Sequence, residues 1–328
     1  MTDCRNLSRV GSLVMRLLLM FIASGAQAGD APAAASIAPA TIPLTRQMDF
    51  TSGINGKSYR LQVALPFSPP PPNGFPVVYV LDGDYYFGTF AAAARGRAMF
   101  GQDLQAAIIV GVGYPDASED PKVSMVRRSL DLTPTEDPTT VSFMKKIGME
   151  PEAMGGADAF LDILEKEVKP RVAAMAPVDA SHSTLFGHSL GGLFVLHALF
   201  TRPTSFSTFL AISPSIWWDG RSVLRDEAAF ARRVSAGDVT PRVFIAVGGD
   251  EETPPKRVLP GGPTKAETDE QIRHARMVGN AKDLAERLKA LKGKPGFVVK
   301  SRVYGREDHM TVPFASLHAM LDFALALP

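Results

Sequence analysis

Hydrophobic residues after position 50 gather in short continuous runs that alternate with longer segments of helical period. Runs of this kind are typical of strands in a sheet that is covered on both faces. They predict strands at residues 77–81, 107–112, 183–186, 208–212, 243–247 and 297–303. The segments between them predict helices at residues 158–175, 192–200, 229–234 and 270–291. This alternation predicts an α/β fold with a mainly parallel central sheet flanked by helices on both faces.

A β-hairpin is expected before the first of these strands. Residues 59–65 have the pattern of a strand, which pairs with an earlier strand around residues 48–51. Asn55-Gly56 between them supplies the positive φ of a tight turn. The four prolines at residues 69–72 lack N–H donors, so they predict a loop after the hairpin.

The first 28 residues have the pattern of a secretory signal peptide. Three arginines precede an apolar run at residues 17–23, and Ala26-Gln27-Ala28 forms a small-x-small cleavage pattern. The run is well short of the roughly 18 apolar residues that a membrane-spanning helix needs, which favours cleavage over an uncleaved anchor. The expectation is an exported protein, periplasmic or secreted, with no stable membrane insertion after leader cleavage.

The rest of the chain is expected to form one catalytic domain, residues 47–328, behind a flexible Ala/Pro-rich lead-in at residues 29–46. Two proline-containing stretches, near residues 116–152 and 253–268, are expected to be insertions. Loops at the carboxyl edge of a parallel sheet build the binding crevice of open α/β folds. Both stretches are therefore assigned to the pocket wall.

Charge and cysteine content exclude several classes of protein. The chain has 35 Lys and Arg residues against 34 Asp and Glu, so it offers no general electrostatic footprint for nucleic acid. Its single cysteine, Cys4, cannot form an internal disulfide or a thiolate zinc cluster, and it is lost with the leader. No metal-binding spacing, phosphate-cradling loop or dinucleotide fingerprint occurs, so neither a metal nor a cofactor is implied. The oligomeric state is left open.

One motif carries chemistry. Gly187-His188-Ser189-Leu190-Gly191 matches GxSxG between a predicted strand and a predicted helix. Small residues are needed there because the backbone turns sharply, and the N-terminus of the following helix stabilises developing negative charge. The motif indicates a nucleophilic Ser189, against the alternative of a glycine-rich packing turn with an inert serine.

A serine nucleophile needs a base and a group that orients the base. His309 lies in a polar loop just beyond the last predicted strand, where a histidine has no core to fill, and is the candidate base. The acid comes from the cluster that follows the strand at residues 243–247. Glu251 is favoured there and Asp250 is the alternative. The non-catalytic alternative for both is a solvent-exposed acidic turn. These candidates follow one another along the chain in the order Ser, acid, His, which is the order that characterises α/β-hydrolases.

Further segments make the chain resemble the α/β-hydrolases of the esterase D and siderophore trilactone esterase branch, which also includes bacterial mycolyl transferases. The resemblance covers nearly the whole chain after the leader. It is carried by Val80-Leu81-Asp82-Gly83, Val110 to Pro115, Arg128 through Pro134, Gly155-Gly156-Ala157-Asp158, Gly187 to Gly192, Ile212-Ser213-Pro214-Ser215 and His309 through Pro313. Such a collinear set is far more specific than the serine motif alone.

The resemblance implies further roles for individual residues. Ser189 would be the nucleophile and His309 the base, and the backbone N–H groups of Asp84 and Leu190 would form the oxyanion hole. Some siderophore esterases are Ser/His dyads, so the alternative to a triad with Glu251 or Asp250 is a dyad that needs no carboxylate. The resemblance places Arg128 near the pocket, where it would bind an anionic substrate, with a surface salt bridge to Asp131 as the alternative. Trp217 and Trp218 would stack on an aromatic acyl group or serve packing alone.

Together these features predict a serine esterase that cleaves carboxylic esters through an acyl-enzyme intermediate. The resemblance suggests siderophore-like trilactones as its small-molecule substrates. One alternative is an acyltransferase that uses the same serine site, and another is a catalytically silent ligand-binding protein of the same fold. A cytosolic thioester hydrolase of the esterase D type is disfavoured by the leader.

Overall fold

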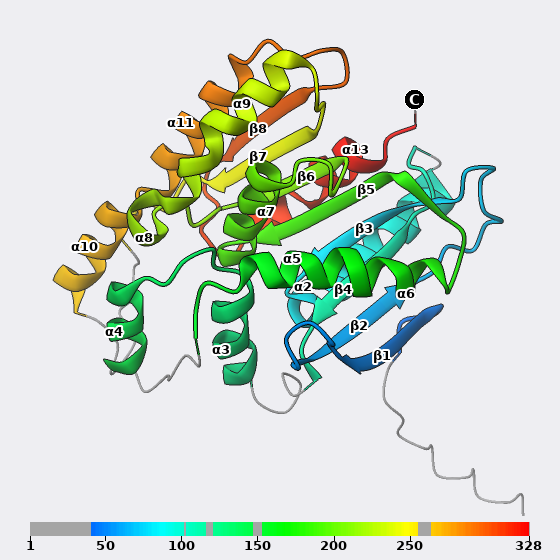
Figure 1. The fold of residues 1–328 in the computed structure, drawn as a ribbon, viewed down its shortest axis with the longest axis horizontal. Helices are drawn as coiled ribbons and strands as arrows, with labels where there is room; N and C mark the ends of the chain where they lie inside the picture. The colour runs from blue at the N-terminus through cyan, green and yellow to red at the C-terminus, as the bar shows by residue number, and fades with distance from the viewer. Residues whose placement is uncertain (1–40, 102, 116–120, 147–152, 255–263, 328) are drawn as a thin grey trace, which may run out of the picture. The chain divides into compact units, whose positions relative to one another are not determined.

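An eight-stranded sheet in the order β1-β2-β4-β3-β5-β6-β7-β8 forms the centre of the fold (Figure 1). The computed structural model describes residues 41–101, 103–115, 121–146, 153–254 and 264–327. The outer strands β1 and β2 pair antiparallel with each other, β2 pairs antiparallel with β4, and the strands from β4 to β8 run parallel. Their bounds are β1 Thr45–Thr51, β2 Ser58–Ala64, β3 Phe75–Leu81, β4 Ile108–Gly113, β5 Val178–His188, β6 Thr208–Ile212, β7 Arg242–Gly248 and β8 Val298–Tyr304. The predicted mainly parallel sheet is confirmed.

Both faces of the sheet are buried, as the continuous apolar runs predict. Along β3, Val77 and Tyr79 belong to one hydrophobic core, while Val78 and Val80 belong to a second core on the opposite face. The same alternation recurs in β4 and β7. Because side chains of a strand point alternately to the two faces, these strands need apolar residues at successive positions.

Helices supply the outer layer of each core (Figure 1). Residues of α5, η3, α6, α7, α9 and α11 pack on one face, and residues of α2 and α13 pack on the other. The bounds are α2 Gly83–Gly96, η1 Arg97–Gly101, α3 Pro121–Asp131, α4 Pro138–Lys146, α5 Ala157–Ile163, η3 Leu164–Val168, α6 Lys169–Ala173, α7 Leu190–Thr201, α8 Trp218–Arg221, η4 Ser222–Asp226, α9 Glu227–Ala236, α10 Lys265–Ala275, α11 Met277–Lys289, α12 Val312–Ala315 and α13 Leu317–Leu325. Flanking helices on both faces are therefore confirmed.

The N-terminal boundary differs from the expectation. The predicted signal peptide at residues 1–28, and most of the lead-in at 29–46, lie outside the described residues. β1 begins at Thr45, inside the expected lead-in, and pairs with β2 in the predicted hairpin. In the turn Gly56 has a positive φ of 69° and Asn55 does not, and the Asn55 side chain accepts a hydrogen bond from the N–H of Lys57 at 3.0 Å.

The predicted helix at residues 270–291 is wrong in its continuity. Arg276 adopts a left-handed conformation, φ 42° and ψ 48°, which ends α10 and starts α11. Arg273 therefore lies inside α10, whereas Arg276 is the residue at the break between the two helices. Arg273 pairs with Glu270, while Arg276 pairs with Asp283.

The expected insertion near residues 116–152 contains two helices, α3 and α4, in its described part. In the second, near residues 253–268, the described part includes the start of α10. Thr264 caps this helix, since its hydroxyl accepts the N–H of Glu267 and the Glu267 carboxylate accepts the N–H of Thr264. Across the described ranges, none of the helices has the length and apolar character that crossing a membrane requires.

Candidate active site

Ser189 sits on a sharp turn between β5 and α7. Its backbone has φ 60° and ψ −117°, a conformation that ordinary residues avoid and that the surroundings must hold in place. Three backbone hydrogen bonds do so. The Ser189 N–H donates to the Ile212 carbonyl at 3.0 Å, and the Ser189 carbonyl accepts the N–H groups of Leu193 at 3.0 Å and Ser215 at 3.1 Å. The serine is thereby fixed at the carboxyl edge of the parallel strands.

Two glycines around the turn, Gly187 in the motif and Gly192 just after it, are required by close backbone approaches. A Cβ on Gly187 would lie 2.1 Å from the carbonyl oxygen of Gly191. A Cβ on Gly192 would lie 2.9 Å from the carbonyl oxygen of Ile212. Both obstacles are main-chain atoms, which a side-chain rotation cannot clear. The sequence pattern is thus a direct consequence of how tightly β5 turns into α7.

Glu251 and His309 form the second part of the site. His309 Nδ1 lies 2.7 Å from Glu251 Oε2, although the residues are 58 positions apart. Oε1 of the same carboxylate accepts the N–H of Gly248 at 2.7 Å and the hydroxyl of Ser213. The Glu251 side chain is only 1% exposed, whereas that of His309 is 37% exposed. The carboxylate is therefore a fixed acceptor, and the imidazole edge opposite Nδ1 is the part available for chemistry.

The neighbouring carboxylates have other surroundings. Asp250 is exposed, and its N–H donates to the carbonyl of Glu307 at 3.0 Å. Glu252 accepts the N–H of Gly279, in the first turn of α11, at 2.9 Å. Of the three adjacent acids, Glu251 is thus the one that the structure places on His309.

His188, the residue directly before Ser189, contacts His309. Its ring lies against that of His309, with centroids 4.5 Å apart and planes tilted by 44°. Its Nδ1 is 2.9 Å from the hydroxyl of Tyr86 on α2. Burial is the main cause that lowers the pKa of His188 well below its usual value, and the neighbouring His309 and Arg128 lower it further. His188 is therefore a neutral, buried residue between Tyr86 and His309, directly before Ser189.

Two helix N-termini meet at the serine turn. Leu190 is the first residue of α7, so its N–H has no carbonyl of that helix to bond. Asp84 lies in the first turn of α2, and its carboxylate accepts the N–H of Tyr114 at 3.1 Å. A Cβ on Gly191 would lie 3.3 Å from Asp82 Oδ2, which shows how closely the start of α2 approaches the start of α7.

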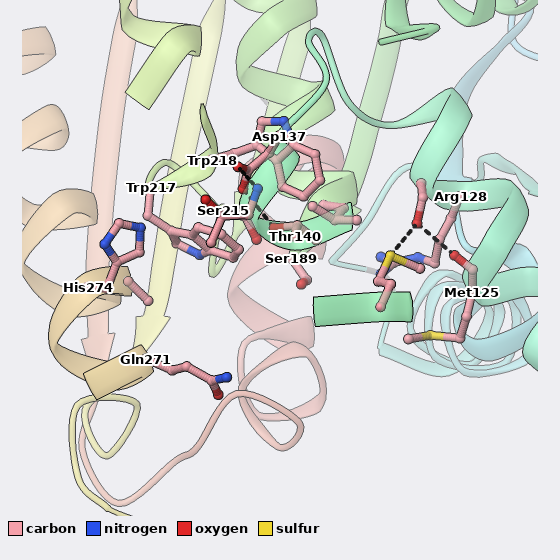
Figure 2. Close-up of a pocket in the computed structure, with 15 residues that line it drawn as sticks. Met125, Arg128, Asp137, Thr140, Ser189, Ser215, Trp217, Trp218, Gln271 and His274 are labelled. Carbon is pink, nitrogen blue, oxygen red and sulfur yellow. Dashed lines mark hydrogen bonds between the residues drawn. The ribbon is translucent and has the colours of Figure 1, made fainter. Parts of the chain in front are cut away.

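A cavity of about 400 Å³ opens beside Ser189 (Figure 2). Its walls come from α3, α4, the segment after β6, and α10, so the first expected insertion does line the pocket. Figure 2 shows Trp217 and His274 on one side of Ser189 and Met125 and Arg128 on the other. The described lining residues are Met125, Arg128, Ser129, Asp137, Thr139, Thr140, Met144, Ser189, Leu190, Ser215, Trp217, Trp218, Gln271, His274 and Ala275.

Arg128 lines the cavity, yet its partner differs from the expected Asp131. Arg128 Nε and Nη2 donate to the two carboxylate oxygens of Asp82 at 2.9 and 2.8 Å. The two side chains are 12% and 3% exposed, so this is a buried bidentate pair and not a surface salt bridge. Asp131 is instead buried, where its carboxylate accepts the hydroxyl of Tyr59 at 3.0 Å.

The two tryptophans differ in their surroundings. Trp218 is buried, and its Nε1 donates to the carbonyl of Thr135 at 3.0 Å, which makes it mainly a packing residue. Trp217 is partly exposed, and its ring meets that of His274 edge-on with centroids 6.1 Å apart. Sequence reasoning missed His274 and Gln271 as pocket residues. Their positions in the chain give no signal, because α10 reaches the cavity only through the tertiary fold.

The fold and this site define an α/β-hydrolase. A family model described as "Putative esterase" matches residues 52–282, and the chain belongs to this family of carboxylic-ester hydrolases. Ferri-bacillibactin esterase BesA of Bacillus subtilis is 32% identical over 289 residues, which cover 87% of this chain and 91% of BesA. The siderophore triacetylfusarinine C esterase of Aspergillus fumigatus is 34% identical over 290 residues, which cover 85% and 93% of the two chains.

Solved structures agree with the family assignment. The BES protein from Bacillus cereus superposes with a TM-score of 0.72 at 30% identity, covering 90% of this chain and all of that one. Siderophore hydrolase EstB from Aspergillus nidulans has a TM-score of 0.72 at 31% identity, covering 88% and 98% of the two chains.

Proposed function

We propose that this protein hydrolyses siderophore esters with Ser189 as nucleophile, His309 as general base and Glu251 as the group that orients the base. The observation that carries the proposal is the 2.7 Å contact between Glu251 Oε2 and His309 Nδ1, in a histidine that also packs on the residue before Ser189. A carboxylate on Nδ1 fixes the tautomer in which Nε2 is free to take a proton.

The proposed reaction has two halves. His309 removes the hydroxyl proton of Ser189 while the serine oxygen attacks the ester carbonyl, and the proton then passes to the leaving alcohol as the acyl–oxygen bond breaks. Water, deprotonated by the same histidine, next attacks the acyl-enzyme and releases the carboxylic acid and Ser189. We place the oxyanion of both tetrahedral intermediates on the N–H groups of Leu190 and Asp84.

The substrate class rests on the relatives. Two curated proteins that match most of this chain are named as esterases of ferri-bacillibactin and of triacetylfusarinine C. A cavity of about 400 Å³ beside Ser189 is large enough to hold one arm of such an ester, with the rest of the molecule outside. The pattern of residues 1–28 supports export of the enzyme to the periplasm or the medium.

Active-site labelling tests the nucleophile. A fluorophosphonate probe should label the wild-type protein and leave Ser189→Ala unlabelled, while Ser205→Ala, a buried serine outside the cavity lining, serves as the matched control. Absence of labelling in the wild type would favour a ligand-binding protein.

Edman or mass analysis of the mature N-terminus after export tests cleavage near residue 28.

Product analysis tests the reaction. The enzyme should release free acid and alcohol from iron-loaded siderophore triesters, and adding an acceptor alcohol should not divert the acyl group. Transfer to the alcohol in preference to water would identify an acyltransferase. Rapid turnover of short activated esters with intact siderophore triesters would contradict the siderophore assignment.

A further inference from the structure

Three large apolar side chains are exposed beside the proposed base, outside the described lining of the cavity. They are Tyr85 on α2, Met310 directly after His309, and Phe314 on α12, and they are 49%, 65% and 51% exposed. Single exposed apolar residues are ordinary on a protein surface, whereas a group of neighbours marks a binding surface. We call these three residues the outer patch.

The ring of Tyr86 connects the outer patch to the site. Its centroid lies 6.0 Å from that of Phe314 and 6.4 Å from that of Tyr85. Its hydroxyl is 2.9 Å from Nδ1 of His188, whose ring packs on that of His309. The two exposed rings are therefore connected to the proposed base through Tyr86 and His188.

The third member of the outer patch, Met310, lies on an ordered turn. Asp308 Oδ1 accepts the N–H groups of Met310 at 2.9 Å and of Thr311 at 3.0 Å. The Asp308 carbonyl accepts the N–H of Val312, the first residue of α12, at 3.1 Å. The main chain around Met310 is thus fixed by its own hydrogen bonds, although the side chain is exposed to solvent.

The proposed reaction decides which half of the ester meets the outer patch. The leaving alcohol oxygen must lie within hydrogen-bond reach of His309, because that histidine returns the proton as the acyl–oxygen bond breaks. The alcohol half therefore begins next to Met310. The described lining of the cavity includes Ser189 and Leu190 but not His309, so the cavity is left to the acyl half.

Resting on the proposed function, we infer that the outer patch binds the alcohol half of the ester and that the cavity takes the acyl half. The outer patch consists of two aromatic rings and a thioether, so it fits an alcohol half with an apolar or aromatic face. In a siderophore ester, the arm bonded through its carbonyl enters the cavity. The part bonded through the alcohol oxygen lies on the outer patch, at the surface of the protein.

Esters that share one acid and differ in the alcohol test the inference. Ethyl, butyl and hexyl butyrate form the same acyl-enzyme, and their alcohols have nearly the same acidity. The ratio of their kcat/KM values therefore reports the contacts of the alcohol half alone. Each methylene fully withdrawn from water contributes about fourfold to binding. Because an open patch covers only part of the chain, we expect kcat/KM to rise by about tenfold from ethyl to hexyl butyrate.

A double variant removes most of the outer patch. Met310→Ser with Phe314→Ser should reduce the hexyl-to-ethyl ratio by about threefold to tenfold, because the alcohol chain loses apolar contacts. A change that only disturbs His309 would lower all three esters in proportion and leave the ratio unchanged. Met99→Ser with Phe100→Ser is the matched control and should keep the wild-type ratio, since these exposed residues lie just beyond the opposite end of α2.

A cavity variant supplies the converse measurement. Trp217→Ala removes an apolar wall of the cavity, so it should lower the kcat/KM ratio of ethyl octanoate to ethyl butyrate, in which only the acid differs. It should leave the hexyl-to-ethyl ratio of the butyrates near the wild-type value. The double variant of the outer patch should do the reverse.

The outcomes separate the inference from the function on which it rests. A wild-type hexyl-to-ethyl ratio near one, or a ratio that the outer-patch variant does not lower, would overturn the inference and leave the esterase function standing. An oligomer that dissociates in the outer-patch variant, measured by sedimentation, would also overturn it, because a second copy would then cover the patch. Failure of the wild type to hydrolyse any butyrate would overturn it as well. Only if fluorophosphonate labelling of Ser189 is absent too would the proposed function fall with the inference.

Discussion

The imidazole of His188 lies against the imidazole of His309, with ring centroids 4.5 Å apart, and the two rings have opposite environments. His188 is buried and bonded to the Tyr86 hydroxyl, and burial holds its pKa well below the usual range. His309 has an exposed edge and a carboxylate on Nδ1. His188 can therefore support the ring of the proposed base without adding a charge that opposes its protonation.

Replacing His188 tests this supporting role. His188→Asn should lower kcat by about tenfold to a hundredfold, because the ring of His309 loses the surface that holds it in place. The acid limb of the pH profile of kcat/KM should not move, since no charge is removed. Tyr86→Phe keeps both rings and should cause a smaller loss. A shift of that limb by about one pH unit would show instead that His188 carries charge.

Glu251 can be separated from its neighbour Asp250 by mutation. Glu251→Gln should lower kcat by about a hundredfold to ten-thousandfold, because the amide cannot accept from Ser213, Gly248 and His309 at once. Asp250→Asn, next to it but exposed, is the matched control and should retain near wild-type activity. If Glu251→Gln is as active as the control, the enzyme works as a Ser/His dyad.

The turn at Ser189 should not tolerate a methyl group before it. Gly187→Ala forces a Cβ against the Gly191 carbonyl oxygen at 2.1 Å, so fluorophosphonate labelling and the free energy of unfolding should both fall. Gly96→Ala is the control, since nothing lies within 4 Å of a Cβ there and the residue is helical. It should stabilise the protein by about 0.5–1 kcal/mol in urea unfolding. An unchanged labelling rate in Gly187→Ala would contradict the close approach.

The strands and the serine turn were predictable because their signals are local. A strand buried on both faces must be apolar at every position, and the turn into α7 requires glycine at position 187 because the Gly191 carbonyl, four residues further on, lies against it. The helix α2 also has a local signal, since Phe87, Phe90 and Ala94 recur at helical spacing. Sequence reasoning overlooked it and treated only the Asp82-Gly83 motif at its start.

Other features depend on residues that are distant in the chain. Asp82 and Arg128 are 46 positions apart, and Glu251 and His309 are 58 apart, so no periodicity links either pair. Glu251 and His309 could still be paired, because the order Ser, acid, His is known for this type of fold. No such rule pairs Asp82 with Arg128. The break at Arg276 was not predictable either, because a left-handed conformation is rare for arginine.

The buried pair of Asp82 and Arg128 should contribute strongly to stability when one partner is removed. Arg128→Met leaves the Asp82 carboxylate buried without its counter-charge and should cost about 3–5 kcal/mol in urea unfolding. Adding Asp82→Asn removes that charge and should recover part of the loss, and asparagine tolerates the left-handed conformation at this position, φ 51°. A double variant that is less stable than Arg128→Met would contradict this account.

Asp131 gives the protein a pH dependence of stability with an unusual sign. Burial raises the pKa of Asp131 to about 6, although Arg127 and the Tyr59 hydroxyl favour the ionised form. In the unfolded chain the pKa returns to about 4. Between these values the folded state holds a proton that the unfolded state has released, so this residue makes the fold less stable as pH rises from about 4 to about 6.

The variant Asp131→Asn isolates this effect. Tyr59 can still donate to the amide oxygen, so the main change is loss of the titration. Relative to wild type, the variant should gain up to about 3 kcal/mol in free energy of unfolding on going from pH 4 to pH 7, because the carboxyl pKa differs by about two between the folded and unfolded chains. Urea unfolding of both proteins across this range measures it, and the difference cancels other groups such as His188. A difference that stays constant or falls with pH would show that folding does not raise the pKa of Asp131.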